Sequence, residues 1–85
     1  MINTLGKARN KIQETDRFFH RDFYVYVLGL NVAKKLCEEV DIKIKNPATE
    51  YKIGEVFGIE VRYNPLVEND NFYLMKRVDY EKEYF

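Results

Sequence analysis

The feature that most constrains the fold is an unbroken apolar run from Phe23 to Leu28, with the sequence Phe-Tyr-Val-Tyr-Val-Leu. Aromatic and β-branched residues of this kind favour strands over helices. Successive side chains in a strand point to opposite faces of the sheet, so both faces of this strand are apolar. We therefore expect it to be central in its sheet or covered on both sides.

Two helices are expected on either side of this strand in the chain. Apolar residues at spacings of three, four and seven predict an amphipathic helix over residues 3–19, which Asn3 or Thr4 would cap. Gly29 ends the strand, and a shorter helix is expected over residues 32–40 with Asn31 as its cap. The apolar stripe of each helix would pack on the core.

Three further strands are expected in the rest of the chain. Strict alternation predicts a half-exposed strand over residues 41–45, and the next strand is expected over 55–63 with Gly58 as a bulge. The last strand is expected over residues 72–76, after a turn at Asn64-Pro65. Residues 78–85 alternate loosely, which predicts a short strand or a disordered end.

The element order α-β-α-β-β-β predicts an α+β fold, with a mainly antiparallel sheet of about four strands and two helices on one face. The 85 residues suffice for one domain over residues 1–85, with 79–85 as a flexible tail. Seven tyrosines and six phenylalanines supply the bulk of the core. Each buries roughly 150–250 Å², which lets a short chain form a real interior.

Charge and composition favour a protein partner inside a cell. The formal net charge is zero, whereas nucleic-acid-binding proteins usually carry a basic excess. Cys37 is the only cysteine, so no internal disulfide can form, which indicates a reducing compartment. The N-terminus lacks the apolar segment of a signal peptide, and no apolar run is long enough for a membrane span. We expect a cytoplasmic protein without membrane contact, in the host cytoplasm if the gene belongs to a phage.

The residues that carry chemistry form no complete catalytic or metal-binding set. The chain contains no serine, which excludes a serine nucleophile. Cys37 lies on an apolar helix stripe and His20 at an element boundary, so a Cys–His pair is not predicted. The polar loop with Glu68 and Asp70 lacks the spacing of a calcium loop. Gly29 could offer N–H groups to an anion, a pattern that most strand-to-helix turns share. We therefore expect a protein that is not an enzyme and needs no cofactor or metal.

Two sets of residues are candidates for binding. Tyrosine is favoured at interfaces because it offers area and a hydroxyl at low entropic cost, although these rings could equally fill the core. The candidates for protein contact are Tyr24, Tyr26, Tyr63, Tyr73, Tyr80, Tyr84 and Phe85. The candidates for phosphate contact are Lys7, Lys11, Arg17 and Arg21. Acids are interleaved with these cations, which favours a solvated helix face.

Two stretches resemble segments of tailed-phage major capsid proteins. Tyr24 to Leu36 is similar to a strand that runs into a short helix. Val56 to Leu66, followed by Phe72 to Met75, is similar to a later pattern with a glycine-centred strand, a proline turn and another strand. The resemblance spans about residues 23–77. It implies a small phage or prophage protein, of the kind that serves as an accessory virion part or inhibits host machinery.

Three hypotheses of function follow. The first is a non-enzymatic phage-type protein that binds another protein through tyrosine-rich strand edges or the tail, for example to inhibit a host or defence factor. The second is a minor virion component that forms a homo-oligomer. The third is a nucleic-acid-binding accessory protein that uses the basic residues of the first helix.

Overall fold

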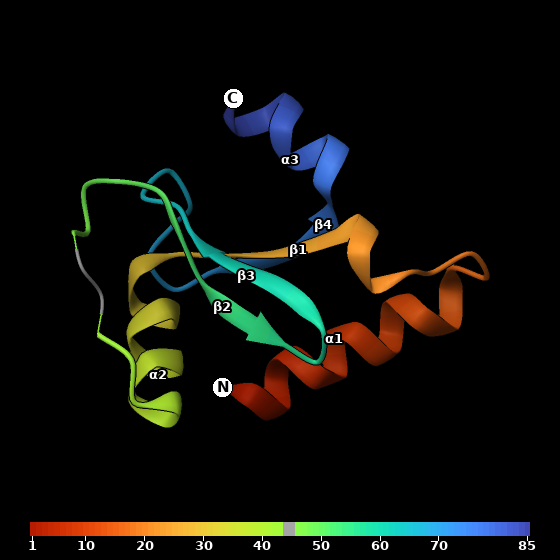
Figure 1. Ribbon diagram of the computed structural model, residues 1–85, viewed down its shortest axis with the longest axis horizontal. Coiled ribbons are helices and arrows are strands. Elements are labelled where there is room, and N and C mark those ends of the chain that lie inside the picture. Colours follow the sequence, from red (N-terminus) through yellow and green to blue (C-terminus); the bar gives the residue numbers. More distant parts are fainter. Residues whose placement is uncertain (44–45) are drawn as a thin grey trace.

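Four strands form one mixed sheet in the computed structural model, which describes residues 1–43 and 46–85. The strands are β1 (Tyr24–Leu28), β2 (Tyr51–Val56), β3 (Ile59–Tyr63) and β4 (Phe72–Lys76). Their order across the sheet is β2-β3-β1-β4, with β1 at the centre (Figure 1). The α+β class and the expected number of about four strands are confirmed, although not every strand lies where it was expected.

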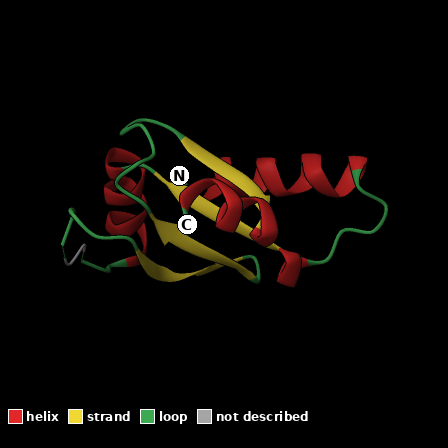
Figure 2. Ribbon diagram, turned by 90° about the horizontal axis from the view of Figure 1, so that it is seen from above, coloured by secondary structure: helices red, strands yellow, loops and turns green. Residues whose placement is uncertain are grey.

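Helices cover both faces of this sheet. The chain forms α1 (Ile2–Thr15), α2 (Leu30–Val40) and α3 (Arg77–Tyr84), with a short 3₁₀ turn, η1 (Arg21–Phe23), before β1. α1 and α2 lie on one side of the sheet and α3 on the other (Figures 1 and 2). The prediction of two helices on one face is therefore wrong in part, because a third helix covers the opposite face.

The strand β1 is buried on both faces, as its apolar sequence predicts. Tyr26 and Leu28 point to the face with α1 and α2, where they join the larger core cluster. Val25 and Val27 point to the other face and pack in a smaller cluster with Tyr80 of α3. This double burial explains why an uninterrupted apolar run forms the centre of the sheet.

The sheet is mixed rather than mainly antiparallel, because its central pair runs parallel. β1 pairs with β3 in parallel and with β4 in antiparallel fashion, and β2 pairs with β3 in antiparallel fashion. Parallel strands need a long connection, and the chain between β1 and β3 contains α2 and β2. The hairpin between β2 and β3 then returns the chain in the direction of β1.

The region predicted as two strands over residues 41–45 and 55–63 folds differently. Asp41 caps α2 in the left-handed conformation, with φ of 56°, and residues 41–43 form a turn and coil instead of a strand. Residues 44–45 of that prediction lie outside the described residues. Residues 55–63, expected as one strand, instead contain the end of β2, a turn and β3. The turn residues Phe57 and Gly58 both have positive φ, 55° and 78°, which suits a tight two-residue hairpin turn. The bulge expected at Gly58 lies instead in β2, between Lys52 and Gly54.

The ends of the helices also differ from prediction. α1 begins at Ile2 without a side-chain cap from Asn3 or Thr4, and it ends at Thr15 because Asp16 is extended. α2 begins at Leu30, with Gly29 in the capping position. Residues 77–84 form α3 instead of a strand or a disordered end.

Candidate functional site

The tyrosines divide into interior and surface groups. Tyr24, Tyr26, Tyr63 and Tyr80 are buried. The hydroxyl of Tyr26 donates to the Leu5 carbonyl at 2.8 Å, and the hydroxyl of Tyr80 accepts from the Asn64 amide at 3.1 Å. Because their side chains fill the core, Tyr26 and Tyr63 offer no surface to a partner in this conformation, and Tyr24 and Tyr80 contribute only the small parts that line two cavities.

The remaining three predicted contact residues lie at the surface of β4 and α3. Tyr73 of β4 is exposed, and its hydroxyl donates to Glu68 at 3.1 Å. Tyr84 is half-buried beside Tyr80, with ring centroids 5.2 Å apart. Phe85 is exposed and places its edge against the Tyr80 ring. The structure therefore does not bring the seven residues together on one surface.

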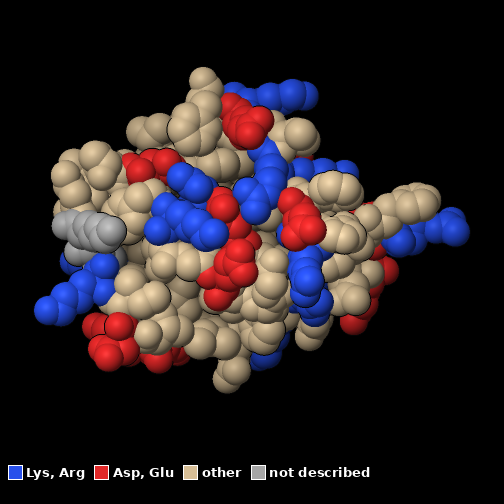
Figure 3. All heavy atoms as spheres, in the orientation of Figure 1, with Lys and Arg blue, Asp and Glu red and all other residues tan. Residues whose placement is uncertain are grey.

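The four predicted phosphate contacts do not form one stripe. Lys7 and Lys11 are exposed on α1, but this helix ends before Arg17, so the four-residue spacing does not continue to Arg21. The guanidinium of Arg17 lies over the Phe18 ring at 5.6 Å from its centroid. On the face of the molecule that Figure 3 shows, basic and acidic groups alternate and no large area of one sign appears.

An apolar groove, which sequence reasoning missed, lies at the end of the β1–β4 pair. Its walls carry Phe18, Phe23 and Val78, whose side chains are 80%, 62% and 58% exposed. Asp16, Tyr24, Lys76 and Arg77 complete the lining, and the groove has a volume of about 460 Å³. Exposed apolar side chains gathered in this way mark an interaction surface more often than scattered ones do.

The segment between α1 and β1 forms one wall of this groove and is fixed by Asp16. The Asp16 carboxylate accepts from the Tyr24 hydroxyl and from the Phe18 amide, the latter at 2.9 Å. These two hydrogen bonds lower the pKa of Asp16. Phe19 packs on Tyr24 with ring centroids 5.1 Å apart, so the segment is anchored while Phe18 remains exposed.

Lys76 and Arg77 line the groove, and Arg17 lies over the exposed Phe18 ring beside it. Among the described residues, Lys76 and Arg17 form no ion pair. Arg77 is different, because its guanidinium bonds to Glu60 at 3.2 Å and to the Asp22 carbonyl at 2.9 Å. The groove therefore combines apolar walls with Lys76, which forms no direct ion pair but lies close enough to the Asp16 carboxylate to lower its pKa.

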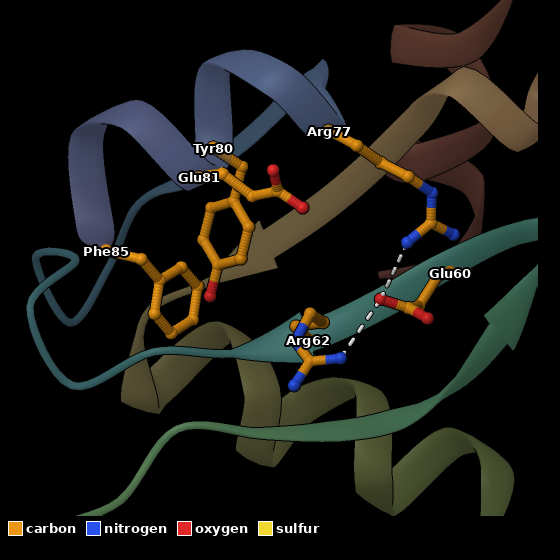
Figure 4. Close-up of a pocket in the computed structure, with 6 residues that line it drawn as sticks. All are labelled: Glu60, Arg62, Arg77, Tyr80, Glu81 and Phe85. Carbon is orange, nitrogen blue, oxygen red and sulfur yellow. Dashed lines mark hydrogen bonds and ion pairs between the residues drawn. The ribbon is translucent and has the colours of Figure 1, made fainter.

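A second cavity, of about 440 Å³, lies between β3 and α3, and four of its six lining side chains are charged (Figure 4). Glu60 bonds to Arg62 at 3.1 Å and to Arg77 at 3.2 Å, and Arg62 also bonds to Glu50. Burial alone would raise the pKa of Glu60, but the two arginines hold it below the ordinary value. The ion pair of Arg77 with Glu60 joins α3 to the sheet. Because Glu50, Glu60, Arg62 and Arg77 neutralise one another, they offer little unpaired charge to a ligand.

The turn at Gly29 is occupied by the protein's own backbone. The Gly29 N–H donates to the Asn71 carbonyl at 2.9 Å, and the N–H groups of Asn31 and Val32 donate to the Asn69 carbonyl at 2.9 and 3.3 Å. The loop before β4 therefore caps α2. These N–H groups are therefore not free to bind an anion, which the sequence at Gly29 had left open.

The reactive side chains are separated in the fold. Cys37 is buried on α2, and burial raises the pKa of its thiol. His20 is exposed and accepts from the Asp22 amide at 3.2 Å, where it caps η1. Within residues 1–43 and 46–85, no three His, Cys, Asp or Glu side chains lie close enough to hold a metal ion.

Tyr24 and Tyr26 are expected to ionise late in an alkaline titration. Burial raises the pKa of both from 10.0 to about 12, and the Asp16 carboxylate adds to the effect on Tyr24. Since the folded-state pKa exceeds the unfolded value, the neutral phenols stabilise the fold below pH 10, and this contribution disappears as the pH rises towards 12. Phenolate absorbance should show a late step that coincides with loss of the circular dichroism of the fold. Ionisation of Tyr24 and Tyr26 with the ordinary tyrosine pKa of 10.0, in a protein that is still folded, would contradict their burial.

Comparisons with known proteins identify no relative. No protein-family model, no curated protein and no solved structure matches the chain. In the part of the chain that the structure describes, no helix is long and apolar enough to cross a membrane. The function must therefore be inferred from the chemistry of the surface.

Proposed function

We propose that this chain is a non-enzymatic protein-binding domain whose contact surface is the apolar groove between Phe18, Phe23 and Val78. The observation that carries the proposal is the exposure of these three side chains around one groove. A partner that fills the groove would remove this apolar surface from water.

The groove favours a protein segment with one bulky apolar side chain next to carboxylates. A volume of about 460 Å³ accommodates an aromatic or long aliphatic side chain. Lys76 in the lining and Arg17 over the Phe18 ring supply positive charge without a direct ion pair among the described residues, and the Asp16 carboxylate offsets part of it. Complementary charge of this kind sets the choice of partner and the rate of association more than the affinity.

The sequence resemblance extends this proposal to the source of the partner. A small phage-type protein with one such groove would act by occupying an acidic segment of a host or defence protein. The zero net charge supports a protein target over nucleic acid, because phosphate recognition relies on a basic excess.

Selection from a displayed library of random short peptides tests the proposal. We expect enriched peptides to carry Phe, Trp, Leu or Met with Asp or Glu close by in sequence. Binding should weaken as salt rises, because exposed charges are screened. No enrichment over an unrelated protein of similar size would contradict the proposal.

Variants of the groove walls locate the binding. Phe18→Ser combined with Val78→Ser removes one apolar side chain from each wall and should weaken binding of a selected peptide about ten-fold or more. Leu66→Ser is the matched control, because Leu66 is 73% exposed but does not line the groove. Equal effects of the two changes would place the binding elsewhere.

A further inference from the structure

The two edges of the sheet are protected to different degrees. β2 forms one edge and carries a bulge together with two charged side chains, Lys52 and Glu55, which pair at 3.7 Å. β4 forms the other edge, has a regular register with β1 and is apolar from Phe72 to Met75. Bulges and charges prevent an edge strand from pairing with another chain, and β4 lacks both until Lys76 at its end.

The charges near β4 have opposite signs at its two ends. Glu68 and Asp70 precede the strand, and Lys76 ends it. None of the three forms an ion pair among the described residues; both acids instead accept hydrogen bonds from neutral groups. A strand of this length spans about 13 Å, so the two ends are well separated.

We propose that β4 pairs with β4 of a second copy of this chain, antiparallel and around a two-fold axis near Leu74. In this arrangement Lys76 of each copy lies towards Glu68 and Asp70 of the other. A parallel arrangement would place like charges side by side. Opposite charges therefore face each other only when two copies of β4 run antiparallel. This self-complementarity favours a second copy of the chain as the occupant of this edge.

The surface of α3 above this edge is compatible with the pairing. Asp79, Lys82 and Glu83 line a shallow hollow together with Met75 of β4. Because these side chains carry both signs, the α3 helices of two copies can meet with Lys82 of one facing an acid of the other. This interface goes beyond the proposed groove and rests on the edge position and register of β4, although Lys76 belongs to both surfaces.

Sedimentation equilibrium with charge-reversal variants tests the pairing. The unchanged protein should form a dimer that dissociates on dilution. Lys76→Glu and Asp70→Lys should each raise the dimer dissociation constant about ten-fold, since each reversal replaces attraction by repulsion at two symmetric positions. The double variant should return to within about three-fold of the unchanged protein, because the opposite charges then face each other again.

Hydrogen exchange supplies a second measurement that needs no variant. The amides of Phe72–Lys76 that point away from β1 should exchange more slowly in concentrated than in dilute solution, while those of β2 at the other edge should not change. A folded monomer at all concentrations would overturn the proposal. So would a dimer that neither charge reversal weakens, or one in which protection appears at β2. None of these outcomes affects peptide binding at the groove. Failure of the dimer proposal therefore does not count against the groove, which the peptide selection tests separately.

Discussion

Replacing Gly29 with alanine is expected to abolish the folded state or nearly so. A Cβ atom at this position would lie 1.9 Å from the carbonyl oxygen of Glu68 and 2.7 Å from its carbonyl carbon. Both are backbone atoms, so no side-chain rotation relieves the clash. The loop that would have to move also caps α2 and leads into β4. We expect a cost above about 4 kcal/mol, in a chain whose total stability is about 4–13 kcal/mol.

Thermal or urea unfolding followed by circular dichroism measures this effect. Gly54→Ala is the matched control, because a Cβ there meets nothing within 4 Å. The control should change the free energy of unfolding by less than about 1 kcal/mol. If both variants unfold alike, the packing of the loop against the turn at Gly29 is not as described.

Tyr26→Ala is expected to produce the second large effect. Tyr26 is fully buried at the centre of β1, and its hydroxyl bonds to the Leu5 carbonyl of α1. Truncation removes an aromatic ring from the larger core cluster and leaves a cavity, for which aromatic-to-alanine changes cost about 3–5 kcal/mol. Tyr26 therefore ties α1 to the sheet through both packing and a buried hydrogen bond.

The conservative variant separates the two contributions. Tyr26→Phe keeps the ring and loses only the hydrogen bond, so we expect a loss of about 1 kcal/mol. Both values come from denaturant unfolding at equal protein concentration. A Tyr26→Ala variant no less stable than Tyr26→Phe would show that the ring does not fill the core.

The central elements of the fold could be predicted because burial determines them. β1 and β4 are apolar runs, and the structure has strands within one residue of the expected bounds. The tail could not be assigned because Val78, Tyr80 and Tyr84 satisfy a two-residue and a helical period almost equally. The structure uses the helical spacing, which brings Tyr80 and Tyr84 together against the sheet.

The periodicity of the sequence does not determine the backbone conformation of single residues or the pairing of strands that are distant in the chain. Strict alternation favoured a strand from Asp41, yet Asp41 adopts the left-handed conformation that ends α2. A glycine within an apolar segment fits a bulge or a hairpin turn, and only the positive φ of Phe57 distinguishes them. The parallel pairing of β1 with β3 depends on where a distant hairpin docks, which short-range periodicity does not encode.

The candidate site was the least predictable part. Tyrosine content indicated an interface, but a short chain uses four of these rings in its core. The exposed phenylalanines gave a signal that was missed, because Phe18 was assigned to the first helix. Only the end of α1 at Thr15 shows that Phe18 and Phe23 belong to a connecting segment beside Val78 of α3.

Chemical-shift mapping by nuclear magnetic resonance tests the central claim most directly. A selected acidic–apolar peptide would be titrated into the labelled protein, with a peptide of scrambled sequence as the control. We predict that the largest shifts fall on the amides of the groove-lining residues, which are Asp16, Phe18, Phe23, Tyr24 and Lys76 to Val78. Shifts concentrated on the Glu60–Arg62 network or on α2, or none at saturating peptide, would contradict the assignment of the groove as the protein-binding surface.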